Sequence, residues 1–159
     1  WLNELAFAPV DLQEDALVDE WSGDRGVGCK YFSQDAVIKL APAAGIPLDG
    51  SLSLADRLKA VQKLMEDDDE RAAAIYRSIG CYLGHTLPLY YRFYEMKHVL
   101  LMGRVTSGKG GSLMVREALR VIADEYPDLE NRIELELPNE RSRRVGQSIA
   151  AASLPEIIV

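Results

Sequence analysis

The sequence contains few of the residues that build disulfide and metal sites. It has two cysteines, Cys29 and Cys81, and two histidines, His85 and His98. Two cysteines are too few for a disulfide framework, and the four residues do not follow the spacing of a zinc site. We therefore expect reduced cysteines with packing roles and no structural zinc. A packed or solvated side chain is the plain interpretation of both histidines.

Positive charge and long apolar runs are also scarce. Lys and Arg total 18 against 25 for Asp and Glu, which gives a formal net charge of −7. An acidic chain repels a phosphate backbone, so non-specific binding of nucleic acid is disfavoured. No run reaches the roughly 18 apolar residues of a membrane-spanning helix, and no leader sequence is recognisable. The sequence thus predicts a cytoplasmic protein with neither a nucleic-acid nor a membrane partner.

The chain is long enough for one hydrophobic core. It has 159 residues, of which 48% are hydrophobic, as is typical of a globular domain. We expect residues 1–159 to form a single domain. The chain opens with Trp1, and its first residues resemble the middle of a sheet, so we also expect it to be the C-terminal part of a longer protein.

The first third of the chain is predicted to be mostly irregular. Residues 5–12 are apolar and interrupted by a proline, which favours a strand or an extended edge. Glycines mark residues 22–29 as a loop before a helix that starts near Ser33 and ends before Pro42. The following prolines and glycines predict another loop, over residues 42–51.

Two helices are predicted next. Ser53 and Asp56 form a capping arrangement before an amphipathic pattern. The acidic run at 66–70 suggests either a metal site or solvated carboxylates that oppose the dipole of the next helix, and the second interpretation is favoured. Apolar residues every three or four positions then predict a long helix over residues 72–94. Its glycines Gly80 and Gly84 would let another backbone approach closely.

The last part alternates strands and helices. Residues 99–102 form an uninterrupted apolar run, which predicts a parallel strand covered on both faces. A helix should begin at Ser112 and end before Pro127. Residues 133–137 alternate apolar with charged side chains, as in a strand with one wetter face, and residues 145–152 predict a final helix. This order predicts an α/β fold with a short, mostly parallel sheet flanked by helices.

The glycine-rich loop over residues 103–112 is the candidate functional segment. It leaves the carboxyl end of the predicted strand and enters a helix, which is where α/β folds bind ligands. Residues 103–109 also match the G-x-x-x-x-G-K pattern of a P-loop. However, Gly110 stands where that motif needs Ser or Thr to hold magnesium, and no later strand ends in a suitable Asp. A P-loop NTPase therefore remains only an alternative.

Several segments together resemble the ROK family of bacterial sugar kinases and related repressors, within the sugar-kinase and actin-like ATPase superfamily. They share an acidic helix start, a Tyr-Leu-Gly helix segment, a short linker, a glycine-ended apolar strand and a small-residue helix. The segments are 68–72, 81–84, 94–97, 98–103 and 144–152, with a further likeness over 18–41. The resemblance implies the C-terminal lobe of a ribonuclease H-like (actin-like ATPase) fold.

The resemblance also implies a site and a cofactor. The adenosine and ribose of ATP, carried with magnesium in the complete protein, would lie on the loop after the strand. The residues expected to contact them are Gly103, Arg104, Thr106, Ser107 and Gly108. The family usually has a second glycine at the position of Arg104, although a guanidinium can stack on a base or pair with a phosphate. Its sugar- and zinc-binding histidine is replaced within residues 2–7.

These expectations lead to one function and one rival. The chain would be the nucleotide-binding lobe of an ATP-dependent sugar kinase, inactive alone because the catalytic Asp and most sugar contacts of this superfamily lie upstream. No pair of residues in the chain forms a convincing nucleophile and general base. The rival is a non-catalytic module of the same fold that senses a ligand or forms a homodimer. The sequence identifies no particular sugar.

Overall fold

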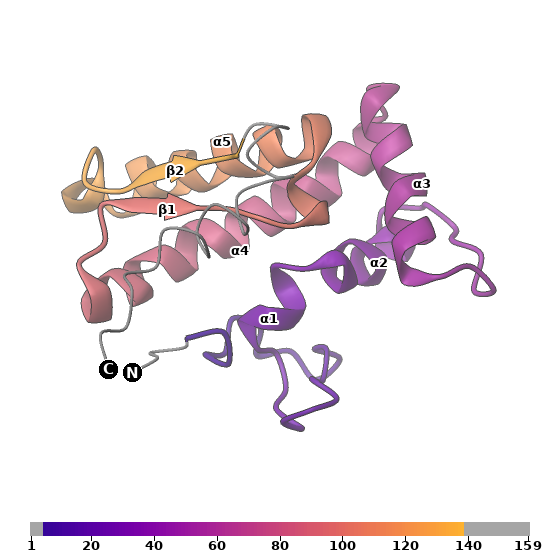
Figure 1. Ribbon diagram of the computed structural model, residues 1–159, viewed down its shortest axis with the longest axis horizontal. Helices are drawn as coiled ribbons and strands as arrows, with labels where there is room; N and C mark the ends of the chain where they lie inside the picture. Colours follow the sequence, from indigo (N-terminus) through magenta and orange to yellow (C-terminus); the bar gives the residue numbers. More distant parts are fainter. Residues whose placement is uncertain (1–4, 139–159) are drawn as a thin grey trace, which may run out of the picture.

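The computed structural model describes residues 5–138, which fold into five α-helices and a two-stranded sheet (Figure 1). The helices are α1 (Gly28–Tyr31), α2 (Gln34–Ala43), α3 (Leu54–Glu66), α4 (Glu70–Tyr94) and α5 (Gly108–Glu125); the strands are β1 (His98–Leu100) and β2 (Glu134–Glu136); two short 3-10 turns are η1 (Arg104–Thr106) and η2 (Pro127–Leu129). The predicted α/β class is therefore confirmed. The helix predicted at 145–152 lies outside the described residues.

Helices α4 and α5 form the central layer and run in the same direction. A Cβ built on Gly80 would meet the Met114 carbonyl oxygen at 2.6 Å, and one built on Gly84 would meet the Ala118 carbonyl oxygen at 2.9 Å. The contact partner moves forward along α5 as the glycine moves forward along α4, so the two helices are parallel. The predicted close approach of a second backbone at the two glycines is confirmed. The core lies here, with Ile79, Leu87 and Ala118 among its fully buried members.

The strands β1 and β2 pair in parallel and lie on this helical layer (Figure 1). Val99 is paired with Leu135 in the register, and both pack against the helical core. The other face carries exposed side chains, among them Leu100 at 54% and Met102 at 47%. Residues 99–102 were predicted to form a strand covered on both faces. Among the described residues this prediction is wrong, because the helices cover only one face of the two-stranded sheet.

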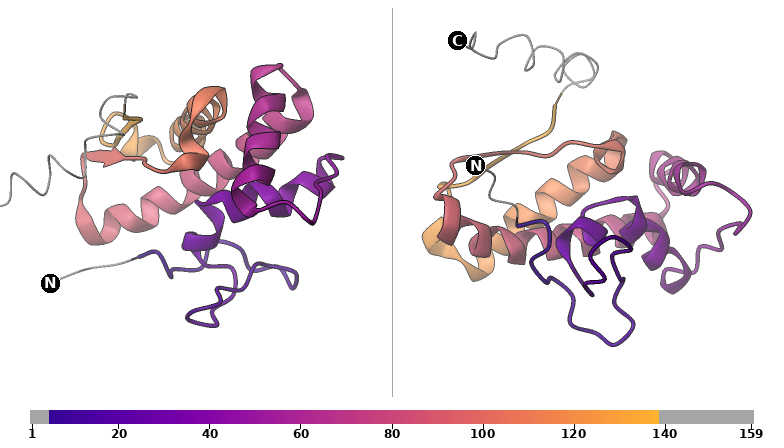
Figure 2. Two further views of the ribbon diagram at one scale, coloured as in Figure 1. Left: turned by 45° about the vertical axis from the view of Figure 1, so that its right-hand side comes forward. Right: turned by 60° about the horizontal axis from the view of Figure 1, so that its bottom comes forward.

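The N-terminal segment packs on the opposite side of α4 from the strands (Figure 2). Of the strand or extended edge predicted for residues 5–12, the structure has no full strand and one isolated bridge, Pro9 to Val27. Backbone hydrogen bonds join residues 6–11 to residues 26–29, among them Val10 amide to Gly26 carbonyl at 2.7 Å, and side chains add to them. The Tyr31 hydroxyl donates to the Asp11 carboxylate and accepts from the Leu17 amide at 3.1 Å. Its ring lies 5.0 Å from that of Tyr82 on α4.

Capping residues define the starts of the middle helices. The Ser53 hydroxyl accepts a hydrogen bond from the Asp56 amide, as predicted. Asp69, within the acidic run at 66–70, caps α4 by accepting from the Arg71 amide at 2.8 Å. This confirms the helix-start interpretation of that run.

Two helix boundaries differ from the sequence prediction. Helix α2 continues through Pro42 to Ala43 and ends one residue after the proline, which cannot donate to the carbonyl four residues earlier. Helix α5 begins at Gly108 rather than at Ser112. None of the described helices combines the length and apolar character needed to cross a membrane. Both cysteines are free thiols.

Candidate functional site

The turn after β1 is fixed by hydrogen bonds to its backbone. Gly103 takes φ 109° and ψ 168°, a conformation open to glycine alone among common residues. The Thr106 hydroxyl donates to the Gly103 carbonyl at 2.9 Å, and the Gln62 amide of α3 donates to the Arg104 carbonyl at 2.8 Å. Val105 is buried beneath them. The chain therefore leaves β1 through one defined turn.

The outer side of this turn is open. A Cβ built on Gly103 would meet no atom within 4 Å. Arg104 is exposed, and its guanidinium forms no ion pair with another described residue. The turn follows the carboxyl end of a parallel strand and precedes a helix, which is the usual place of ligands in open α/β sheets.

The amino end of α5 is occupied by acidic side chains from residues 66–68. The Lys109 amide, in the first turn of α5, donates to the Glu66 carboxylate at 3.2 Å. The Lys109 ammonium donates to the Asp68 carboxylate at 2.6 Å and to the Glu66 carbonyl at 2.9 Å. The hydrogen bond to Asp68 raises the pKa of Lys109.

These contacts bear on the P-loop alternative. A P-loop uses the amides and the lysine at the start of its helix to hold phosphates. Here one of those amides and the lysine already bind the protein's own carboxylates. A phosphate would have to displace Glu66 and Asp68. The geometry thus argues against phosphate binding at the start of α5.

A buried tyrosine supports the start of α5. The Tyr76 ring is fully buried beneath Gly110, where an added Cβ would fall 2.5 Å from the ring. Its hydroxyl has no hydrogen-bond partner among the described residues. Burial raises the pKa of Tyr76 to about 12. The glycine at 110, which breaks the P-loop pattern, is therefore required by packing.

The five predicted contact residues lie in one continuous turn, but they differ in exposure. Gly103, Arg104 and Gly108 are exposed, and Ser107 is half-buried. Thr106 is 4% exposed and its hydroxyl bonds to Gly103, so its side chain holds the turn in shape. Glu66 was not foreseen at this place, because it comes from α3, 43 residues before the amide that it caps.

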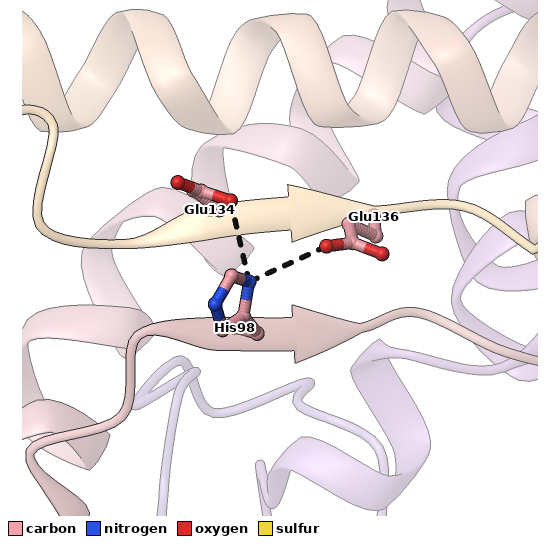
Figure 3. Close-up of side chains that lie close together, drawn as sticks. All are labelled: His98, Glu134 and Glu136. Carbon is pink, nitrogen blue, oxygen red and sulfur yellow. Dashed lines mark ion pairs between the residues drawn. The ribbon is translucent and has the colours of Figure 1, made fainter.

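A second polar cluster lies on the outer face of the sheet (Figure 3). His98 Nδ1 lies 3.2 Å from Glu134 Oε2 and 3.4 Å from Glu136 Oε1. Sequence reasoning treated His98 as an isolated side chain. The alternating pattern at residues 133–137 was a usable signal, because it predicted a strand with both glutamates on its wet face.

Comparison of the chain with models of known families, with curated proteins and with solved structures finds no match.

Proposed function

We propose that the chain is the nucleotide-binding lobe of a sugar-kinase-like, ATP-dependent phosphotransferase with a ribonuclease H-like fold. The observation that carries the proposal is the open turn at Gly103, at the carboxyl end of a parallel strand and next to the amino end of α5. Backbone groups of such a turn can approach a flat nucleoside without obstruction by side chains. The segments that resemble the ROK family add support to this assignment.

The adenosine side of the nucleotide is favoured over its phosphates. The base and ribose are uncharged, so the acidic side chains at the start of α5 do not repel them. The triphosphate would meet Glu66 and Asp68, which already occupy the groups that could hold it. In this proposal ATP lies with adenosine on the turn, and the residues that place the phosphates and magnesium belong to the complete protein outside this lobe.

Each residue of the turn has a separate part in the proposed site. Gly103 offers its backbone, and the Arg104 guanidinium can stack on the adenine face. Thr106 keeps the turn in shape through its bond to Gly103. Ser107 and Gly108 form the edge of the site beside α5. The lobe binds the nucleotide and does not transfer phosphate alone.

The proposal is tested by titrating the chain with adenosine, ADP and ATP, with and without magnesium, by amide NMR. Adenosine and ATP should bind with similar affinity, and the largest shifts should occur at residues 103–108. Arg104→Ala should weaken adenosine binding about 10-fold, because one stacking contact contributes about 1.4 kcal/mol. Arg132→Ala, which removes another exposed arginine, is the matched control and should leave the affinity unchanged.

Three outcomes would contradict this proposal. No binding of adenosine or ATP at millimolar concentration would remove the nucleotide and favour a sensing or dimerising module. Equal weakening by Arg104→Ala and Arg132→Ala would mean that general charge, and not the turn, holds the ligand. Magnesium-dependent ATP binding that is much tighter than adenosine binding would indicate phosphate recognition, as in a P-loop.

A further inference from the structure

The cluster of His98, Glu134 and Glu136 combines an imidazole and two carboxylates from two neighbouring strands (Figure 3). His98 is paired directly with Glu134 in the parallel register, and Glu136 is two residues further along β2. Side chains two residues apart on a strand point to the same face. The register of β1 and β2 therefore places all three on the outer face of the sheet.

The spacing of the three ligand atoms matches that around a metal ion. One donor atom from each residue lies within 4.8 Å of the other two, and the histidine nitrogen lies 3.2 and 3.4 Å from the carboxylate oxygens. Bonds of about 2.0 to 2.2 Å to zinc, at tetrahedral angles, separate neighbouring ligand atoms by about 3.3 Å. The two separations from the histidine nitrogen already have this length, and the two carboxylate oxygens lie within 4.8 Å of each other, so rotation of these exposed side chains would let them surround a cation.

The charges of the cluster are unbalanced in favour of a cation. Glu134 and Glu136 each have one ion-pair partner in the part of the chain that the structure describes, and it is the same His98 nitrogen. All three side chains are exposed, at 59 to 67%, so water can complete the coordination. Two carboxylates held side by side repel each other, and a divalent ion removes that repulsion.

We propose that His98, Glu134 and Glu136 bind a divalent transition-metal ion, with zinc as the best-fitting member of that class. An imidazole together with carboxylates favours zinc and its first-row neighbours over calcium and magnesium, which prefer oxygen ligands alone. The ion links β1 to β2. A sheet of two strands with three residues each is weakly stable alone, so the link stabilises it.

This site is independent of the proposed nucleotide. His98 lies on β1 and the two glutamates lie on β2, whereas the nucleotide is proposed to bind residues 103–108, so the two sites share no residue. The metal readouts below need no nucleotide. Failure of one proposal therefore leaves the other untouched.

The test is zinc binding to the chain after removal of metal by a chelator, followed by calorimetry and thermal unfolding. We expect one zinc ion per chain and a rise in Tm of about 5 to 10 °C at zinc concentrations about 100-fold above Kd. Glu134→Gln and Glu136→Gln should each weaken binding at least 10-fold, and His98→Ala should weaken it further. The glutamine variants keep the side-chain shape, so they remain informative if His98→Ala folds poorly.

The matched control is His85→Ala. His85 is also exposed, but within residues 5–138 it is paired with one carboxylate, that of Glu125, at 3.7 Å. This variant should bind zinc as the unchanged chain does. Zinc binding that survives His98→Ala, or that is lost equally in His85→Ala, would overturn the site. Absence of zinc binding at millimolar concentration, or stabilisation by magnesium equal to that by zinc, would overturn it as well.

Discussion

Gly80 of α4 lies directly against the carbonyl oxygen of Met114 in α5, at a distance where a Cβ would stand 2.6 Å from that oxygen. The backbone of α4 therefore comes close to α5 here, against both the Met114 carbonyl and the Glu117 side chain. A second contact of the same kind, at Gly84, lies one turn further along. These glycines bring α4 close enough to α5 for one layer of helices to support the sheet.

Gly80→Ala should destabilise the protein by about 2 kcal/mol. Alanine stabilises a helix by about 1 kcal/mol relative to glycine. The steric clash of its methyl group with the Met114 carbonyl costs more, because that carbonyl belongs to the backbone of α5 and cannot move away. The free energy of unfolding in urea measures the effect. Gly50→Ala is the control, because a Cβ there meets no atom within 4 Å. Equal stability of the two variants would show that the helices have room to separate.

Asp69 predicts a dependence of stability on acid pH. Hydrogen bonds from the Arg71 side chain and amide lower the pKa of Asp69 to about 2. Because the folded-state pKa lies below the unfolded value near 3.8, the contribution is fully present above about pH 4 and is lost as the pH falls toward 2. Asp69→Asn keeps a capping oxygen but removes this titration.

The measurement is Tm against pH for the unchanged chain and for Asp69→Asn. The unchanged chain should have the higher Tm at pH 6, and the difference should shrink between pH 4 and pH 2. Asp128→Asn, at an exposed position in η2, should show no such convergence. Parallel Tm curves for Asp69→Asn and the unchanged chain would contradict a charged cap at α4.

The sequence predicted the parts of the fold that depend on neighbouring residues. The caps at Ser53 and Asp69 act over two or three positions, and the apolar stripe of α4 repeats with the helical period. The parallel arrangement of β1 and β2 also followed, because a helix between two strands leaves room for a crossover. These features need no knowledge of distant contacts.

The features that were mispredicted depend on contacts between distant segments. Glycine disfavours helices, so residues 108–111 were assigned to a loop. They are helical in the structure, and a side chain at position 110 would clash with the Tyr76 ring. The Glu66 carboxylate then caps the same helix from α3. The apolar character of residues 99–102 gave no indication that one face would stay open among the described residues.

Tyr76→Phe should leave stability unchanged or raise it by up to about 1 kcal/mol at neutral pH. The hydroxyl is buried and has no partner among the described residues, so its removal relieves an uncompensated desolvation. The pH effect lies on the alkaline side. Burial raises the pKa of Tyr76 to about 12, and the unfolded state therefore loses its proton first, near pH 10.

Stability should consequently fall between pH 10 and pH 12, and it should fall less steeply in Tyr76→Phe. Urea unfolding at pH 8, 10 and 11 measures both slopes. A loss of more than about 2 kcal/mol at pH 8 would mean that the hydroxyl makes a hydrogen bond after all. Identical slopes above pH 10 would show that Tyr76 ionises normally in the folded protein.

Tyr31→Phe makes the same chemical change with the opposite expected result. The Tyr31 hydroxyl donates to the Asp11 carboxylate, which is 7% exposed, and accepts from the Leu17 amide at 3.1 Å. Loss of the hydroxyl leaves a buried carboxylate with fewer donors, which should cost about 2 kcal/mol in unfolding free energy. Tyr82→Phe keeps the neighbouring ring and serves as the control, with a change below about 0.5 kcal/mol. If Tyr31→Phe proved as stable as Tyr82→Phe, the Tyr31 hydroxyl would have no part in holding residues 5–27 on α4, which would depend on ring packing and on the Tyr90 hydrogen bond to the Leu5 carbonyl.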